Sequence, residues 1–216
     1  DAATAVDVGN YTIIPGGYTS DNYDITFVNG ELTITPATLS VTADNKSKVY
    51  DAALFTEFTV FYSGFAGDDG PGDLGGTLTF GGTAPSAINV GTYTIIPDGL
   101  TSDNYNITFN NGTLNITTAA LTITAEDKSK VYDGQAFTPF TVTYSGFVDG
   151  EDETDLQGSL SFSGTAVGAT NAGDYVITPG GFTSQNYSIS YISGALGITT
   201  AALTITADNK TKAYDG

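Results

Sequence analysis

The chain has 216 residues, of which 24 are acidic and only six are basic, all six of them lysines, so its formal net charge is −18. It contains no cysteine, histidine, methionine or tryptophan. This composition excludes thiolate nucleophiles, zinc sites built from cysteine and histidine, and Ser-His-Asp triads.

The charge and composition also limit the kinds of partner that the chain can bind and the fold class that it can adopt. A strongly negative chain is a poor ligand for nucleic acid or for anionic membranes, and no apolar run is long enough to span a bilayer. Hydrophobic residues at 40% and aromatic residues at 12% are too abundant for a disordered polyelectrolyte. The abundance of glycine, threonine and serine is typical of an all-β protein. We therefore expect a β protein without enzymatic activity.

One sequence motif recurs three times and sets the domain organisation. Segments that begin LSVTADNK, LTITAEDK and LTITADNK start at Leu39, Leu121 and Leu203, so each step is 82 residues (39 to 121 to 203). A repeat of this length suits one small domain better than a solenoid unit. The predicted segments are 1–35, the C-terminal part of a preceding repeat; 36–118 and 119–200, two complete repeats; and 201–216, the N-terminal part of a following repeat. The junctions are very short, which favours a semi-rigid array.

Alternation of apolar and hydroxyl residues predicts about seven strands in each complete repeat. In the second repeat the apolar positions are Leu121, Ile123 and Ala125; Phe140, Val142 and Tyr144; Leu160 and Phe162; Tyr175 and Ile177; Tyr187, Ile189 and Tyr191; and Leu196 and Ile198, with a short strand near 130–132. Pro179 is expected to end its strand. Seven strands indicate a tandem array of small Ig-like β-sandwich domains. If the acidic stretch 150–156 forms a short helix, β-grasp-like domains are the alternative.

Turn residues add one specific prediction. Asn111 and Gly112 lie between two alternating segments that end at Ile116, and Asn-Gly tolerates the positive φ of a type I′ turn. The pattern predicts a β-hairpin at 107–116. Asn29-Gly30 and Ser193-Gly194 occupy the same place in the other copies.

All six lysines occur as Lys-x-Lys pairs: Lys46 and Lys48, Lys128 and Lys130, and Lys210 and Lys212. Alternate residues of a strand point to one face, so each pair shares a face. The pairs could form a basic stripe for an acidic glycan, or supply a lysine for an intramolecular isopeptide crosslink. The structural alternative, which we favour, is protection of an edge strand against pairing with other chains.

Two acidic loops are the candidate metal sites. Their carboxylates are Asp68, Asp69 and Asp73 in the first repeat, and Asp149, Glu151, Asp152 and Asp155 in the second. Oxygen ligands in a glycine-containing loop suit Ca²⁺, although the spacing is not that of an EF-hand. Solvated loops without a metal are the favoured interpretation, so no cofactor is expected apart from this calcium hypothesis. Paired carboxylates also occur in glycosidases, but adjacent acids in a polar loop do not suggest a catalytic cleft.

The aromatic residues that recur between the repeats have two interpretations. They are Phe58 and Phe140, Tyr62 and Tyr144, Phe65 and Phe147, Phe80 and Phe162, Tyr93 and Tyr175, and Tyr105 and Tyr187. They could form carbohydrate-binding platforms. Because they occupy the inward phase of predicted strands, core packing is the stronger interpretation.

Several phrases of the second repeat resemble the tandem MBG and YDG-type repeats of large bacterial surface adhesins. These are Lys-Val-Tyr-Asp-Gly ending at Gly134, Tyr-Ser-Gly-Phe ending at Phe147, Gly-Asp-Tyr ending at Tyr175, and Asn186-Tyr187 followed by Gly-Ala-Leu-Gly-Ile ending at Ile198. The resemblance implies a secreted, extracellular, multi-repeat protein anchored elsewhere in its length, without enzymatic activity. The first repeat departs from the motif at Ala52, where the second has glycine.

We therefore expect an extracellular structural array that forms a semi-rigid stalk or fibre of a cell-surface adhesin. The expected partners are neighbouring repeats of the same chain. One alternative is a filament subunit that polymerises by strand exchange, and another is a glycan- or protein-binding module. Neither nucleic-acid binding nor direct membrane insertion is expected.

Overall fold

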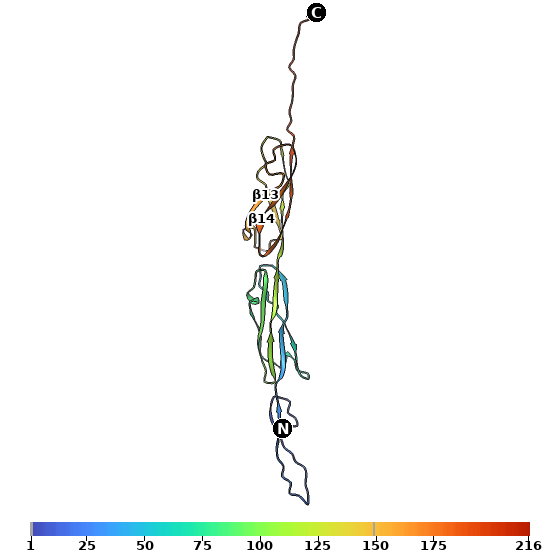
Figure 1. Ribbon diagram of the computed structural model, residues 1–216, viewed down its shortest axis with the longest axis vertical. Coiled ribbons are helices and arrows are strands. Elements are labelled where there is room, and N and C mark those ends of the chain that lie inside the picture. The colour runs from blue at the N-terminus through green and yellow to red at the C-terminus, as the bar shows by residue number, and fades with distance from the viewer. Residues whose placement is uncertain (1, 149) are drawn as a thin grey trace. The chain divides into compact units, whose positions relative to one another are not determined.

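The computed structural model describes residues 2–148 and 150–216, and they build an all-β protein (Figure 1). The chain divides into two compact units, Asp1–Thr117 and Thr118–Gly216. Helical structure in the described residues is limited to three 3₁₀ turns of three residues each. In this part of the chain, no helix has the length and apolar character needed to cross a membrane.

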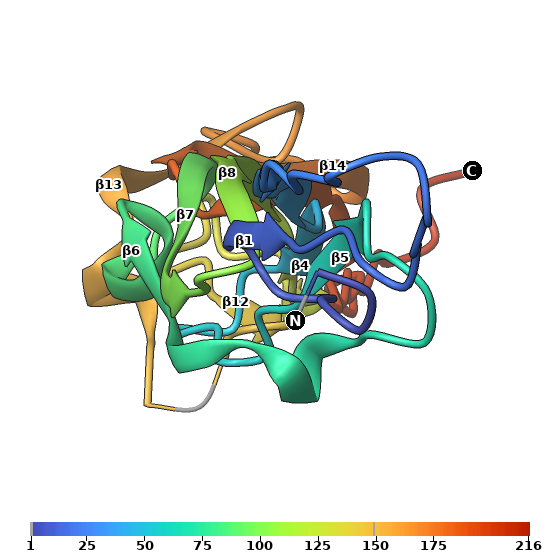
Figure 2. The same ribbon diagram turned by 90° about the horizontal axis from the view of Figure 1, so that it is seen from below.

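The first complete repeat contains seven strands in two sheets. The strands are β3 (Ala37–Ala43), β4 (Lys46–Val49), β5 (Val60–Ser63), β6 (Gly75–Gly82), β7 (Gly91–Thr101), β8 (Tyr105–Asn110) and β9 (Gly112–Thr117), with 3₁₀ turns η1 (Pro71–Asp73) and η2 (Ala84–Ser86). One sheet has the order β5-β3-β8 and the other β4-β9-β7-β6. Seen from below, β6 and β7 lie side by side, as their pairing requires (Figure 2). Both sheets are mixed, because β3 runs parallel to β8 and β4 runs parallel to β9.

The second complete repeat reproduces this topology strand for strand. Its strands are β10 (Ala119–Ala125), β11 (Lys128–Val131), β12 (Val142–Ser145), β13 (Gln157–Ser163), β14 (Gly173–Thr183), β15 (Tyr187–Ile192) and β16 (Gly194–Thr199). The two sheets have the orders β12-β10-β15 and β11-β16-β14-β13. The predicted β-sandwich-like repeats of seven strands are therefore confirmed. The acidic stretch forms only the 3₁₀ turn η3 (Glu153–Asp155), so it supplies no helix for the β-grasp alternative.

The core of each sandwich follows the alternation of the sequence. Leu39, Val41 and Leu114 are fully buried in the first repeat, as are Ile123 and Leu196 in the second. The recurring aromatic residues surround these aliphatic side chains. The Phe58–Phe80 ring centroids are 5.5 Å apart, and those of Phe140 and Phe162 are also 5.5 Å apart. Such aromatic pairs stabilise a core beyond the area that they bury, which agrees with the packing interpretation.

The segments that flank the complete repeats are less complete. In residues 2–35, β1 (Gly9–Ile13) and β2 (Gly30–Ile34) form a two-stranded antiparallel sheet. The sheet leaves Tyr11, Leu32 and Ile34 only half-buried, and the segment between its strands is exposed; Tyr23 in that segment is 79% exposed. Residues 201–216 are all described, and they form no strand and are exposed along their whole length.

The predicted hairpin at 107–116 is wrong. The strands β8 and β9 flank a single residue, Asn111, but they belong to different sheets: β8 pairs with β3, while β9 pairs with β4 and β7. The connection therefore crosses from one sheet of the sandwich to the other. A Cβ at Gly112 would lie 2.6 Å from the Ala43 carbonyl oxygen, so glycine is needed here for close backbone approach. A Cβ at Gly194 would likewise lie 2.6 Å from the Ala125 carbonyl oxygen.

The expectation that Pro179 ends its strand is also wrong. β14 continues through it to Thr183 because the strand changes partners at this point. Residues up to Ile177 pair with β16, whereas from Thr178 onward the strand pairs only with β13, where Pro179 lies opposite Phe162. A proline is tolerated where a strand has a neighbour on one side only, because its missing N–H leaves no ladder bond unmade on the open side.

Candidate functional sites: the lysine loop and the acidic loop

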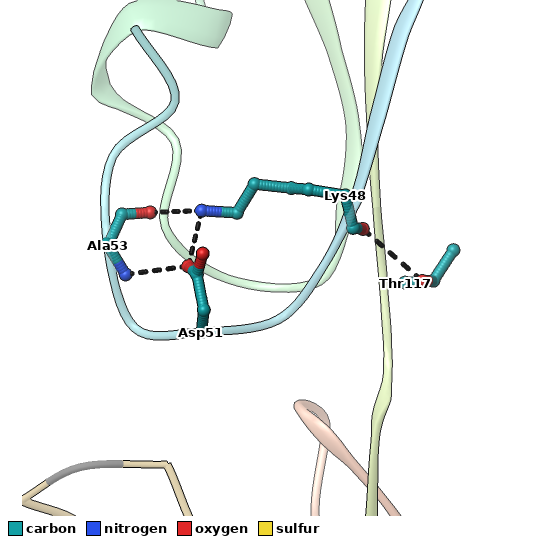
Figure 3. A network of polar contacts seen from close by, with 4 residues as sticks. All are labelled: Lys48, Asp51, Ala53 and Thr117. Atoms are coloured by element: carbon teal, nitrogen blue, oxygen red, sulfur yellow. Dashed lines mark hydrogen bonds and ion pairs between the residues drawn. The ribbon is translucent and has the colours of Figure 1, made fainter.

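The Lys-Val-Tyr-Asp motif builds a small loop closed by its lysine. Lys48 lies on the edge strand β4, and its Nζ donates to Asp51 Oδ1 at 2.5 Å and to the Ala53 carbonyl oxygen at 2.5 Å. The Ala53 backbone N–H donates to the same Asp51 Oδ1 at 3.0 Å. Figure 3 shows the lysine side chain reaching from the strand into the loop, while Thr117 donates to the Lys48 carbonyl at 3.3 Å. The motif thus links the edge strand to the chain that leaves it.

The second repeat contains the same arrangement. Lys130 Nζ donates to Asp133 Oδ1 at 2.5 Å and to the Gln135 carbonyl oxygen at 2.7 Å, and the Gln135 N–H donates to Asp133 at 2.9 Å. An aspartate that accepts from the backbone two residues ahead forms an Asx turn. In the exposed C-terminal segment, Lys212 and Asp215 also form an ion pair, with 2.7 Å between the charged atoms. The lysine and aspartate are therefore partners in all three copies.

These contacts lower the pKa of the aspartate in each lysine loop. The hydrogen bond from Lys48, followed by that from the Ala53 N–H, holds the pKa of Asp51 below its ordinary value of 3.8. Asp133 has a lowered pKa for the same reasons, with Lys130 and Gln135 as the donors. Hydrogen bonds to the charged form of a carboxyl favour that form. Both loops therefore carry an ionised aspartate under all but acidic conditions.

The lysine pairs of the two complete repeats lie on edge strands, as the edge-protection interpretation expects, whereas Lys210 and Lys212 lie in a segment without a strand. β4 and β11 each end a four-stranded sheet. The Lys48 and Lys130 side chains are only 11% and 14% exposed, and their ammonium groups are taken by loop oxygens, so they do not form an open basic stripe for an acidic glycan. Lys128 pairs with Glu126 at 2.9 Å, and the hydrogen bonds from Lys128 and Thr141 lower the pKa of Glu126. The isopeptide hypothesis stays a prediction.

In the first acidic loop, two of the candidate calcium ligands serve the fold. The Tyr105 hydroxyl donates to Asp69 Oδ2 at 2.6 Å and accepts from the Ala66 N–H at 2.9 Å. Asp73 accepts from the Gly70 N–H at 2.8 Å and closes the 3₁₀ turn η1. Asp68 is exposed. The loop is therefore attached to the sandwich through Tyr105, whose pKa is raised by the hydrogen bond to Asp69.

The second acidic loop also has a tyrosine that anchors it and a carboxylate that caps its 3₁₀ turn, but the acidic residues differ. The Tyr187 hydroxyl accepts from the Val148 N–H at 3.0 Å and donates to Glu151. Burial, and then the bond to Glu151, raise the pKa of Tyr187. Asp152 caps the turn η3 by accepting from the Thr154 N–H at 2.8 Å, and hydrogen bonds from Thr154 lower the pKa of Asp152.

The carboxylates do not converge on one point. Asp155 accepts from the Asp152 N–H at 3.0 Å, while Glu151 is directed to Tyr187, and Asp149 lies outside the described residues. Throughout residues 2–148 and 150–216, no group of three or more acidic side chains is placed to hold a metal ion. The calcium hypothesis therefore has no assembled ligand set behind it in this part of the chain, and chelation remains its test.

Two roles were not predicted: the ion pair of the lysine motif, for which the sequence holds a signal, and the attachment of the acidic loops by tyrosine hydroxyls. The lysine and the aspartate of the motif are three residues apart in every copy, and this constant spacing indicates an ion pair. Tyr105 and Tyr187 were assigned to the core, and both are indeed buried, but their hydroxyls also anchor the acidic loops. Tyr105 is 36 residues from Asp69 in sequence, so no local pattern indicates this contact.

These features define a class of protein: a tandem array of small β-sandwich domains whose repeated polar motifs are hydrogen-bonded within the fold. Comparison with known families then identifies the repeat. The model of the MBG domain (YGX type) matches residues 1–33, 39–115 and 121–197, and the chain belongs to this family. The resemblance drawn from the motifs is thereby confirmed. A search of curated proteins finds no match to the chain.

Proposed function

We propose that this chain is a spacer segment of an extracellular bacterial surface protein, in which MBG domains in tandem form the stalk or fibre of an adhesin. The observation that carries the proposal is that each complete repeat has its own seven strands and its own buried aliphatic core. Such a domain needs no ligand to complete it. Its partners in this role are the neighbouring repeats of the same chain, and no enzymatic step is part of the proposal.

The polar motifs support the same role. A lysine held by loop oxygens, tyrosines bonded to loop carboxylates and carboxylates that cap 3₁₀ turns all stabilise a domain that has no disulfide. The chain is also strongly acidic. Like charges along a tandem array repel one another and keep it soluble and extended.

Solution scattering and single-molecule stretching of the full chain test the proposal. A single compact globule of this length would have a radius of gyration of about 17 Å, and a stalk segment should exceed that value clearly. Stretching should give two separate unfolding events, each releasing roughly 250 Å of chain, as expected for about 80 residues at ~3.6 Å each, less the folded length. A radius near that of a globule, or one cooperative event, would contradict the spacer role.

The same experiments separate the two alternatives. A scattering mass that rises with protein concentration would support a filament subunit. Binding of the chain to an array of glycans, with loss of binding when the acidic loops are changed, would support a binding module. A constant monomer mass with no glycan bound leaves the spacer role as the function.

A further inference from the structure

The unit Asp1–Thr117 contains a joint between the end of one repeat and the start of the next, and one side chain bridges it. Asn104 Oδ1 accepts from the Val8 backbone N–H at 2.9 Å, and Asn104 Nδ2 donates to Asp7 Oδ1 at 2.9 Å. These partners are separated by 96 and 97 residues in sequence. The two bonds agree with each other, because a backbone N–H can only donate, so the amide oxygen must face Val8 and its NH₂ group must face the carboxylate.

We propose that the Ser-x-Asn-Tyr turn that contains Asn104 is the docking surface by which a repeat holds the end of the repeat before it. Its partner is a loop that offers one free backbone N–H and one side-chain oxygen, here Val8 and Asp7. Asn104 is the residue that fixes the orientation of the joint. The inference deepens the spacer role proposed above and depends on that role only for its biological use.

The turn that contains Asn104 is held in place by hydrogen bonds within its own repeat. The Ser102 hydroxyl accepts from the backbone N–H groups of Asn104 and Tyr105, each at 3.1 Å. The Asn104 carbonyl accepts from the Ala37 N–H at 3.0 Å, where β3 begins. The Tyr105 hydroxyl is bonded to Asp69. The asparagine side chain is therefore presented by a backbone fixed on both sides, which lowers the entropy lost when its hydrogen bonds form.

The loop that docks is also shaped in advance, and the same shape is built in every repeat. The Tyr11 hydroxyl donates to the Asp7 carbonyl at 2.8 Å. Tyr93 donates to the Asn89 carbonyl at 2.8 Å, and Tyr175 donates to the Asn171 carbonyl at 3.0 Å. Each repeat thus prepares one loop of this kind. Its first position carries Asp or Asn, and both residues have a side-chain oxygen that can accept from an asparagine amide.

Apolar packing at this joint is incomplete, which gives its directional hydrogen bonds more weight. Only residues 35 and 36 separate β2 from β3. A cavity of about 200 Å³ remains between the two sides, lined among others by Val8, Ile34 and Tyr105. Val6, which also lines it, is 83% exposed. Because this space is not filled, the directional bonds of Asn104 contribute to a defined angle between the two sides.

Asn22 provides a matched control within the same chain. It stands at the same place of a Ser-x-Asn-Tyr turn, and its backbone N–H donates to Ser20 at 3.1 Å as Asn104 does to Ser102. Within residues 2–148 and 150–216, no hydrogen bond of the Asn22 side chain to another group is found. Asn22→Ala therefore removes the same atoms without touching the joint.

The test follows the Val8 amide and the joint separately in the full chain. Asn104→Ala should speed hydrogen exchange of the Val8 N–H by roughly fivefold to tenfold, as the loss of about one hydrogen bond predicts. The chain has no cysteine, so spin labels at Thr12→Cys and Thr77→Cys report the distance across the joint. Their distance distribution should broaden in Asn104→Ala and stay narrow in Asn22→Ala.

Exchanging the side chains of Asn104 and Asp7 distinguishes loss of the bridging hydrogen bonds from a general disturbance of the turn. Asn104→Asp keeps the acceptor for Val8 but places a carboxylate beside Asp7, so it should broaden the distribution. Adding Asp7→Asn should narrow it again, because an amide then faces the new carboxylate. Unchanged Val8 exchange, an unchanged distribution in Asn104→Ala, equal effects of Asn22→Ala, or absence of rescue would each overturn the proposal. If the scattering radius stays large in such a case, the spacer role stands without this joint.

Discussion

The Lys48 ammonium lies 2.5 Å from the Asp51 carboxylate, and the lysine side chain that carries it is only 11% exposed. A short-range ion pair on a surface loop normally contributes little. Here the lysine also donates to the Ala53 carbonyl, and the aspartate accepts from the Ala53 N–H. Three bonds close one loop, so the motif acts as a unit and not as an isolated pair.

Replacing the lysine should therefore loosen the first repeat. Lys48→Met keeps the aliphatic stem but leaves Asp51 and the Ala53 carbonyl without their donor, and we expect a loss of about 1 kcal/mol, since solvent partly screens the exposed carboxylate. Hydrogen exchange of the buried Leu39 and Val41 amides reports the stability of this repeat. Lys46→Met on the same face of β4 is the matched control. Equal effects of the two substitutions would contradict the loop-closing role.

The stabilisation by the two lysine loops should depend on pH in one direction. The pKa values of Asp51 and Asp133 lie below 3.8 in the folded chain. A carboxyl with a lowered folded-state pKa contributes stability that is present above its unfolded pKa and is lost as the pH falls through the folded one.

We therefore expect wild type to exceed a Lys48→Met, Lys130→Met variant in urea midpoint by a constant margin between pH 5 and pH 7. The margin should shrink below about pH 4, as the aspartates become protonated. Carboxyl chemical shifts followed by NMR should place both midpoints under 3.8. A margin that persists unchanged at pH 2 would show that the ion pairs are not its source.

The strands could be predicted from sequence, whereas their partners could not. Alternation identified the buried face of Leu121 and Ile123 because a half-buried strand imposes a period of two. The Asn111-Gly112 connection shows the limit. Its local chemistry is that of a hairpin, but the long-range parallel pairing of β3 with β8 and of β4 with β9 places its two strands in different sheets. No local pattern carries that information.

The candidate sites show the same limit: their residues can be located in the sequence, but their partners cannot. The sequence locates the two acidic stretches, but it does not indicate which group donates to each carboxylate. Tyr105 is 36 residues from Asp69, and only the folded sandwich brings them within 2.6 Å. The role of Asn104 has no local signal either, because its partners Val8 and Asp7 lie in the preceding repeat.

The departure at Ala52 predicts a stabilising substitution. Ala52 has φ +58°, and the corresponding Gly134 has φ +78°, so both repeats use the left-handed region at this turn. That region costs a residue with a Cβ roughly 1–2 kcal/mol. Ala52→Gly should therefore raise the stability of the first repeat by about 1 kcal/mol, less the entropy that glycine loses on folding.

The reciprocal change is its control. A Cβ at Gly134 would meet nothing within 4 Å, so Gly134→Ala should destabilise the second repeat through backbone strain alone. Urea unfolding followed by hydrogen exchange in each repeat measures both changes. A destabilised Ala52→Gly would mean that the alanine is held by contacts and is not strained.

Removing one tyrosine hydroxyl should release the second acidic loop. Tyr187→Phe takes the acceptor from the Val148 N–H and the donor from Glu151, and we expect a loss of about 1–2 kcal/mol, with faster amide exchange at Val148. Tyr144→Phe is the control, since its hydroxyl has no hydrogen bond among the described residues and burial raises its pKa. Equal loss in both variants would place the effect in the core packing and not in the loop.

Chelation should leave the melting temperature unchanged. The carboxylates proposed for calcium already have donors: Asp69 faces Tyr105, Asp73 closes η1 through the Gly70 N–H, and Asp152 caps η3. An ion bound only by the folded chain would raise its stability in proportion to the logarithm of its concentration. Melting curves with EDTA and with millimolar CaCl₂ should therefore coincide. A rise with calcium that disappears in Asp152→Asn and persists in Asp68→Asn would instead locate a site in the second loop, with these carboxylates exchanging their backbone donors for the metal.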